Sequence, residues 1–187
     1  MSESLLVTHC SPTLAGLKTG NLFNCKCECV REVDNFIRKW NKALNPKGVY
    51  IKVMRINKGM VLIYVYRKAK LMQVIQNKEI REFMEHHGYT CTCLETMLDK
   101  LAAKLQGNNG FPHEIGVFLG YPFEDVKAFI ANKGKNYKHV GHWKVYTDEH
   151  AAIRTFSRFK KCTELYCQKL EEGTNLLKLT VNSRCIA

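Results

Sequence analysis

Hydrophobic residues recur at intervals of three and four positions in three segments of the chain. Such spacing places the apolar side chains on one face of a helix, and each face is expected to join the core. The residues that form these stripes are Val33, Phe36, Ile37, Trp40 and Leu44; Leu94, Leu98, Leu101 and Leu105; and Ala152, Phe156, Phe159, Cys162, Tyr166 and Leu170. The pattern predicts one amphipathic helix in each segment, and one or two further helices over residues 69–87.

Two apolar segments, residues 50–56 and 60–66, flank the turn sequence Asn57-Lys58-Gly59. A short connection of this kind between two strand-like segments predicts a β-hairpin. The second segment is almost wholly apolar, which predicts a strand in the centre of a sheet. Residues 111–146 predict a strand, a turn, a helix, a loop and a strand, with the first strand over residues 113–119 and the helix after Pro122.

Together these elements predict an α+β fold in which about four mainly antiparallel strands pack with five to seven helices. The chain of 187 residues has 45% hydrophobic content and contains no Ser/Gly-rich linker. We therefore expect a single domain over residues 1–187. The first helix is expected to begin at Ser11 and Pro12, which suit a helix cap and a first turn, and to end near Thr19.

The chain is basic, with 29 Lys and Arg residues against 17 Asp and Glu residues and a formal net charge of +12. This surplus favours acidic partners, either an acidic protein or nucleic acid. The dense basic clusters at residues 67–70 and 158–161 lie on or beside predicted amphipathic helices. Solvent-exposed helix faces therefore explain these clusters better than a nucleic-acid interface does.

The N-terminal residues lack the basic start and the long apolar segment of a signal peptide. The longest apolar run, residues 60–66, is too short to span a bilayer. The sequence thus predicts a cytoplasmic protein without membrane insertion. In that compartment its nine cysteines are expected to be thiols or metal ligands, and an odd number cannot pair completely within one chain.

Cys10 immediately precedes the predicted start of the first helix. Unpaired backbone amides and the helix dipole stabilise a thiolate at such a position. Cys10 is therefore the best candidate for a nucleophile or a soft metal ligand. The alternative interpretation is a small buried residue without chemical function.

Cys25, Cys27 and Cys29 occupy alternate positions, so an extended backbone would project their thiols to one side. Cys91 and Cys93 could complete a thiolate centre for zinc, copper(I) or an iron–sulfur cluster. Zinc sites more often use two-residue spacers between cysteines. Reduced thiols in loops are the alternative interpretation of these five residues.

Several blocks of the sequence carry a resemblance to a known family. They include HCSPTLAGLK at residues 9–18 with NLF at 21–23, PHEIG at 112–116, FLGYP at 118–122 and EDV at 124–126. With NKGKNY at 132–137, WKVY at 143–146 and KCT at 161–163, they resemble the bacterial family known as domain of unknown function 3793 over nearly the whole chain. The family pattern has positions matching Cys10, His113 and Glu114, but we do not associate the cysteine triplet with it. The resemblance implies an anaerobic Gram-positive host and a link to iron uptake or flavodoxins.

One functional hypothesis is an enzyme with a cysteine nucleophile. Cys10 followed far downstream by His113 is the chain order of papain-like cysteine hydrolases and transferases, so a papain-like arrangement is one expectation for the fold. The His113 imidazole would take the thiol proton. Glu114, Asn136 and Asp125 are candidates for the group that orients the imidazole, although an ideal strand would point Glu114 to the face opposite His113.

The second hypothesis is a non-catalytic protein that binds a metal, haem or an iron-linked redox partner. Cys10, His9, His113, His139 and His142 supply suitable ligand atoms. The basic surface would suit an acidic flavodoxin or the haem propionates. Against this hypothesis, lone histidines are usually not ligands. His139 and His142 are three positions apart, so on a regular strand they would project to different faces, and simple exposure of either is the alternative interpretation.

Overall fold

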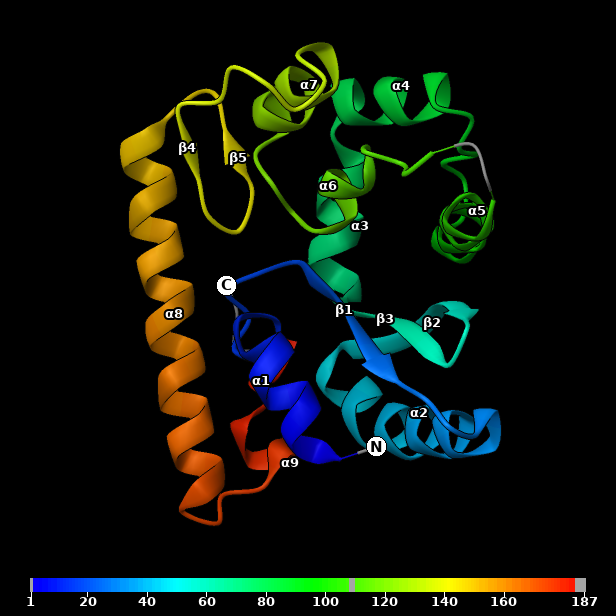
Figure 1. Cartoon of the computed structure of the whole chain (residues 1–187), viewed down its shortest axis with the longest axis vertical. Coiled ribbons are helices and arrows are strands. Elements are labelled where there is room, and N and C mark those ends of the chain that lie inside the picture. Colours follow the sequence, from blue (N-terminus) through cyan, green and yellow to red (C-terminus); the bar gives the residue numbers. More distant parts are fainter. Residues whose placement is uncertain (1, 108–109, 184–187) are drawn as a thin grey trace.

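The computed structural model describes residues 2–107 and 110–183. Its centre is an antiparallel sheet with the strand order β1–β3–β2, formed by β1 (Gly20–Lys26), β2 (Val49–Asn57) and β3 (Met60–Arg67) (Figure 1). The β2–β3 turn holds Lys58 and Gly59 at φ angles of 47° and 73°, and glycine tolerates this left-handed conformation without strain. The predicted hairpin and the central position of its second strand are both confirmed.

Helices cover both faces of this sheet (Figure 1). The first face packs against α1 (Glu3–Leu14), α2 (Val30–Leu44) and the short α9 (Leu176–Leu179). The second face packs against α3 (Lys68–Gln76), α4 (Lys78–His86), α5 (Leu94–Gln106), α6 (Ile115–Phe118) and α7 (Phe123–Ala131). A single-turn 3-10 helix, Asn45–Lys47, joins α2 to β2.

The central strand β3 is apolar throughout because both of its faces are covered. Its side chains on the first face are Val61, Ile63 and Val65, and those on the second face are Leu62, Tyr64 and Tyr66. The sheet therefore divides the core into two clusters of buried side chains. A residue packed against one face is separated by the sheet from a residue packed against the other.

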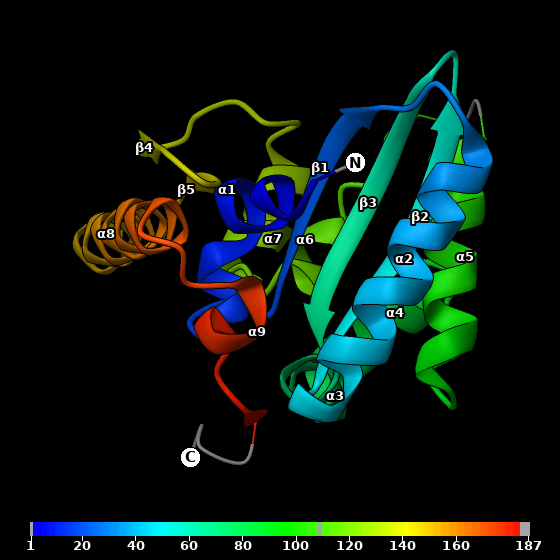
Figure 2. The ribbon, with the colours of Figure 1, turned by 90° about the horizontal axis from the view of Figure 1, so that it is seen from below.

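The long helix α8 (Glu149–Glu171) packs along α1. Asp148 caps the start of α8 by accepting a hydrogen bond from the Ala151 amide at 2.9 Å. A second small sheet, in which β4 (His139–Val140) pairs with β5 (Lys144–Val145), lies between α7 and α8 (Figure 1). Figure 2 shows the three-stranded sheet between α8 on one side of the molecule and α5 on the other.

The α+β class is confirmed. Residues 2–107 and 110–183 contain nine α-helices and five strands, compared with the five to seven helices and about four strands expected. The additional elements are short ones, such as α6 and α9, which a hydrophobic stripe cannot reveal because they span about one turn. Within these residues, no helix is both long and apolar enough to cross a membrane.

The strand predicted for residues 113–119 is wrong. The segment instead forms α6, with the Leu119 amide bonded to the Ile115 carbonyl at 3.0 Å. All residues from Glu114 to Leu119 are buried, and the apolar side chains among them join the core on the second face. A short apolar run that is buried on all sides is compatible with a helix as well as with a strand. The alternation of residue types over residues 113–119 therefore did not distinguish the two.

The predicted start of the first helix is also wrong. Helix α1 begins at Glu3 and ends at Leu14, so Ser11 and Pro12 lie in its last turns. Leu6, Val7, Cys10 and Leu14 form the buried stripe that extends the helix toward the N-terminus. Cys10 consequently lies in the interior of the helix, away from its start.

Candidate ligand-binding site

A cavity of about 230 Å³ lies between α6, α7 and the β4–β5 hairpin, on the second face of the sheet. We call it the aromatic cavity because five rings line it: Phe111, His113, Tyr121, Phe129 and Trp143. The other lining residues include Leu22, Ile115, Leu119, Asp125, Val126 and Lys144. A concave, mainly apolar space with few polar groups is typical of a small-molecule site.

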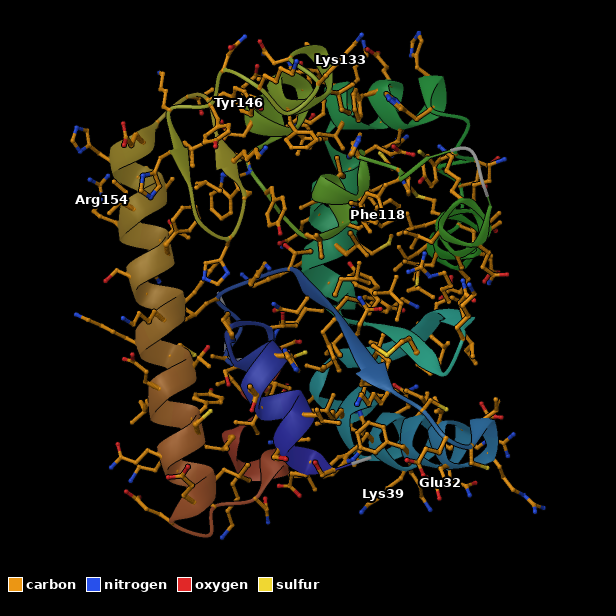
Figure 3. All side chains as sticks on the ribbon, in the orientation of Figure 1. Glu32, Lys39, Phe118, Lys133, Tyr146 and Arg154 are labelled. Carbon is orange, nitrogen blue, oxygen red and sulfur yellow. The ribbon has the colours of Figure 1, made fainter. Side chains whose placement is uncertain are left out.

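Asp125, in the first turn of α7, fixes one wall of the aromatic cavity. Its carboxylate is 3% exposed and accepts hydrogen bonds from Trp143 Nε1 at 2.8 Å and from the amides of Tyr146 and Thr147 at 2.9 Å each. The Thr147 hydroxyl donates a fourth bond at 2.9 Å. Figure 3 labels Tyr146 in this loop and Phe118 in α6. Because four donors already occupy the carboxylate, Asp125 positions the Trp143 indole and is poorly placed to act as a base.

Gly116 allows α6 to approach α7 closely enough to form the cavity. A Cβ atom at this position would lie 2.7 Å from Val126 Cγ2 and 3.3 Å from the Tyr121 ring. The first distance is shorter than any ordinary carbon–carbon contact. A larger residue would therefore push α7 and its aromatic neighbours away from α6.

His113 and Lys144 supply donors beside these rings. The exposed His113 imidazole lies 4.9 Å from the Phe129 ring and 5.9 Å from the Phe111 ring. Lys144 Nζ donates to the Gly134 carbonyl at 2.7 Å and lies 5.8 Å from the centroid of Phe129. An ammonium group has three donors. One bonds to Gly134 and the group also lies 4.7 Å from the ring centroid of Tyr137, so Lys144 has at most two donors for a ligand. This combination suits an apolar ring that carries an anionic group.

The structure does not bring Cys10 and His113 together. Cys10 is fully buried in the core on the first face, whereas His113 lines the aromatic cavity on the second. Burial raises the pKa of the Cys10 thiol, with Lys18 opposing in part. The thiol is therefore held in the protonated form, which is a poor nucleophile. The papain-like arrangement expected for this pair is not formed.

Glu114 and Asn136 have structural contacts in place of the expected orienting role. The buried Glu114 carboxylate accepts bonds from Lys104 Nζ at 2.5 Å and from the Tyr89 hydroxyl at 3.1 Å. Burial disfavours its ionised form, but these bonds outweigh burial, and the pKa of Glu114 is lowered. Asn136 is exposed, and its amide donates to Asn132 Oδ1 at 3.4 Å. Within residues 2–107 and 110–183, neither side chain forms a hydrogen bond with His113 or Cys10.

The five cysteines expected as metal ligands are dispersed. Cys25 is buried and Cys27 half-buried on the first face, whereas Cys91 packs against the core of the second face. Cys29 and Cys93 are exposed at the starts of α2 and α5. Across residues 2–107 and 110–183, no group of three or more His, Cys, Asp or Glu residues is placed to hold a metal ion.

The other histidines proposed as ligands pack against aromatic rings. His9 stacks on Phe23 with ring centroids 4.7 Å apart. His139 and His142 lie 6.1 Å and 5.5 Å from the Phe156 ring, and His139 also approaches the Glu149 carboxylate at 3.5 Å. These contacts account for the three side chains without a bound metal or haem.

Sequence reasoning selected His113 but missed most of the other groups at this site. Phe129 entered only as part of a predicted helix, Trp143 and Lys144 as part of a predicted strand and a family-like block, and Asp125 as a candidate to orient the His113 imidazole. An Asp residue in the first turn of a helix usually favours the helix start electrostatically. Nothing in the sequence signals that this carboxylate bonds to an indole 18 positions away.

The comparisons with known proteins identify a family. No curated protein and no solved structure matches the chain. The model of the family described as protein of unknown function (DUF3793) matches residues 6–180, which is nearly the whole chain and includes every residue of the aromatic cavity. The protein therefore belongs to the DUF3793 family.

Proposed function

We propose that the protein binds a small ligand in the aromatic cavity, and that this ligand combines a flat apolar ring with a carboxylate. The observation that carries the proposal is the meeting of five rings with the donors of His113 and Lys144 around one apolar space. Aromatic side chains favour a flat ring through stacked and edge-to-face contacts. The ammonium group of Lys144 favours a negative charge on the ligand.

The size of the cavity limits the ligand. Its volume of about 230 Å³ lies just below the range of roughly 300–1,000 Å³ that is usual for drug-sized ligands. A single-ring acid is therefore favoured over haem. Benzoate has about nine non-hydrogen atoms, and a ligand of this size gains roughly 0.5 kcal/mol of binding free energy per atom. Its binding free energy would then be about −4.5 kcal/mol, which corresponds to a Kd of roughly 0.5 mM.

This proposal retains the binding class of function but changes the ligand expected from the sequence. The metal alternative has no assembled donor group among the described residues to support it. The thiol-dependent activity expected of Cys10 is disfavoured by the burial of its sulfur. An acidic protein partner such as a flavodoxin and a cytoplasmic location stay predictions from the sequence, and the net charge of +12 is compatible with both.

Calorimetric titration with benzoate, benzamide and acetate tests the proposed ligand class. Benzoate should bind most tightly, benzamide more weakly because it lacks the charge, and acetate not measurably because it lacks the ring. Lys144→Met should weaken benzoate binding about threefold to tenfold while changing benzamide binding little. The matched control is Lys135→Met, since Lys135 is exposed in the neighbouring loop and does not line the cavity.

Two results would contradict the proposal. One is equal affinity for acetate and benzoate, which would show that the rings do not contribute. The other is the lack of benzoate binding at roughly twenty times the expected Kd. A loss of both benzoate and benzamide binding in Lys144→Met would indicate instead that the loop depends on the Lys144–Gly134 bond, and it would contradict the charge-recognition part of the proposal.

A further inference from the structure

A second cavity, of about 430 Å³, lies between the α1–β1 connection and the start of α8. We call it the Lys18 cavity. Its charged lining residues are Lys18, Lys70, Asp125 and Asp148, and its lining threonines are Thr19, Thr147 and Thr155. It shares Asp125 and Trp143 with the aromatic cavity but otherwise has its own lining.

Lys18 is buried in this cavity without an anionic partner. The residue is 6% exposed, and its Nζ lies 5.2 Å from the ring centroid of Tyr121 and 5.9 Å from that of Phe159. Within the described residues, no hydrogen bond or ion pair involves this amine. Lysine is almost never buried to this degree unless it is paired, because an ammonium loses its hydration.

The two acids that line the Lys18 cavity are engaged elsewhere. Asp125 accepts four hydrogen bonds from the Trp143–Thr147 segment, and Asp148 caps α8. Lys70, which is half-buried in the lining, adds a second positive group and forms no ion pair in the part of the chain that the structure describes. The lining therefore holds two amines and two carboxylates, and within the described residues no ion pair joins either amine to either carboxylate.

These surroundings favour the neutral, nucleophilic form of Lys18. Burial lowers its pKa to about 8, and the nearby Cys10 opposes this effect only in part. At neutral pH an appreciable fraction of the amine is then unprotonated, whereas an ordinary lysine with a pKa near 10.4 is almost wholly charged. A desolvated lysine of this kind is the usual nucleophile toward carbonyl compounds.

We infer that the Lys18 cavity is a covalent binding site in which the Lys18 amine forms an imine with a small 2-oxo acid. The amine lone pair attacks the carbonyl carbon, and the resulting C–N bond is accompanied by protonation of the former carbonyl oxygen. The C–O bond then breaks, a C=N bond forms, and both amine protons leave with that oxygen as water. No oxidant or reductant is needed. Lys70 supplies the charge that recognises the carboxylate.

Reductive trapping tests this inference with pyruvate as the probe. The folded protein is incubated with pyruvate and cyanoborohydride at pH 7.5, and intact mass followed by peptide mapping locates the alkylated amine. Lys18 should be modified on the order of ten to a hundred times faster than the exposed Lys39, because its lower pKa increases the unprotonated fraction. Lys18→Arg should remove this fast modification, while Lys39→Arg should leave it unchanged.

A second comparison tests the role of Lys70. Lys70→Met should slow trapping with pyruvate about threefold to tenfold but leave trapping with acetaldehyde, which has no carboxylate, unchanged. The far-ultraviolet circular dichroism of each variant establishes that it is folded. Alkylation of Lys18 no faster than that of Lys39 would overturn the inference. So would reversible pyruvate binding without a trapped adduct, which would make the site one for anions only. Neither outcome depends on benzoate binding in the aromatic cavity.

Discussion

The carboxylate of Asp125 accepts a hydrogen bond from the indole nitrogen of Trp143 at 2.8 Å. The same carboxylate binds the amides of Tyr146 and Thr147 at 2.9 Å. One side chain at the start of α7 therefore fixes the end of the β4–β5 hairpin and one ring of the aromatic cavity. Because Asp125 and Trp143 line both cavities, this contact is the structural link between the two proposed sites.

Asp125→Asn should lower the free energy of unfolding by about 2–4 kcal/mol. The asparagine amide would direct N–H groups at backbone or indole donors, since the native carboxylate accepts on both oxygens. Chemical denaturation measures the change. The control is Glu124→Gln at the adjacent exposed position, where the ion pair with Lys127 should contribute less than about 0.5 kcal/mol. Equal effects of the two substitutions would contradict the anchoring role of Asp125.

Arg67 is 1% exposed and donates to the carbonyls of Thr13, Leu14 and Val181. It thereby provides hydrogen-bond donors for the last carbonyls of α1 and holds the C-terminal segment against this helix end. Arg67→Met would remove a charged donor from all three carbonyls, of which Thr13 and Leu14 keep bonds from the amides of Gly16 and Val181 at 3.1 Å each. We therefore expect a loss of about 3 kcal/mol in the free energy of unfolding, because the charge-assisted bonds of a buried group are lost. The exposed Arg38→Met should change stability by less than about 0.5 kcal/mol. A loss below about 1 kcal/mol for Arg67→Met would show that water replaces the guanidinium.

Alkylation with iodoacetamide should distinguish the cysteines by burial. The exposed Cys29 and Cys93 should react first, whereas the fully buried Cys10 should react only when the protein unfolds. Peptide mapping at increasing times measures each rate, with Cys162 as a second buried thiol for comparison. Rapid labelling of Cys10 in the folded protein below neutral pH would contradict its position in α1 and restore the nucleophile hypothesis.

Lys18 should make stability depend on pH in the alkaline range. Burial lowers its pKa to about 8 in the folded state, whereas the unfolded value should be near 10.4. Between these values the unfolded chain binds more protons, so the free energy of unfolding should rise with pH. Below about pH 8 the Lys18 amine is charged in both the folded and the unfolded chain, and above about pH 10.4 it is neutral in both. Outside this window the contribution of Lys18 to the free energy of unfolding is therefore constant.

The difference in unfolding free energy between the native protein and Lys18→Met isolates this contribution from other titrating groups. It should change by up to about 3 kcal/mol across that window. The native protein should gain stability relative to the variant as pH increases. A difference that stays constant from pH 7 to pH 11 would contradict the buried, unpaired state of Lys18.

Local patterns in the sequence were sufficient to predict the helices and strands that form their own backbone hydrogen bonds and have a long apolar face. The stripe from Val33 to Leu44 corresponds to α2, and the segments around Asn57-Lys58-Gly59 correspond to the β2–β3 hairpin. The all-apolar second segment also gave the position of β3 in the sheet. In these cases local preference and tertiary packing favour the same structure.

Local patterns failed where distant contacts decide the outcome. The face against which Cys10 packs depends on how α1 meets the sheet, and its burial removed the chemistry that its sequence neighbours indicated. The contact between Asp125 and Trp143 and the burial of Lys18 between two rings likewise arise only from the folded chain. His113 was selected for a partnership with Cys10, yet it lines a cavity built from residues that no motif marked.

The most direct test of the proposed function is a benzoate titration followed by the indole N–H signals in a ¹H–¹⁵N NMR spectrum. The chain has two tryptophans. Trp143 lines the aromatic cavity, whereas Trp40 is buried on the first face and serves as an internal control. Trp40→Phe assigns the two signals.

The proposal predicts that benzoate shifts the Trp143 signal in a saturable manner, with a Kd of roughly 0.5 mM, and leaves the Trp40 signal in place. A Trp143 signal that does not move, or two signals that move together in proportion to benzoate concentration, would contradict ligand binding in the aromatic cavity.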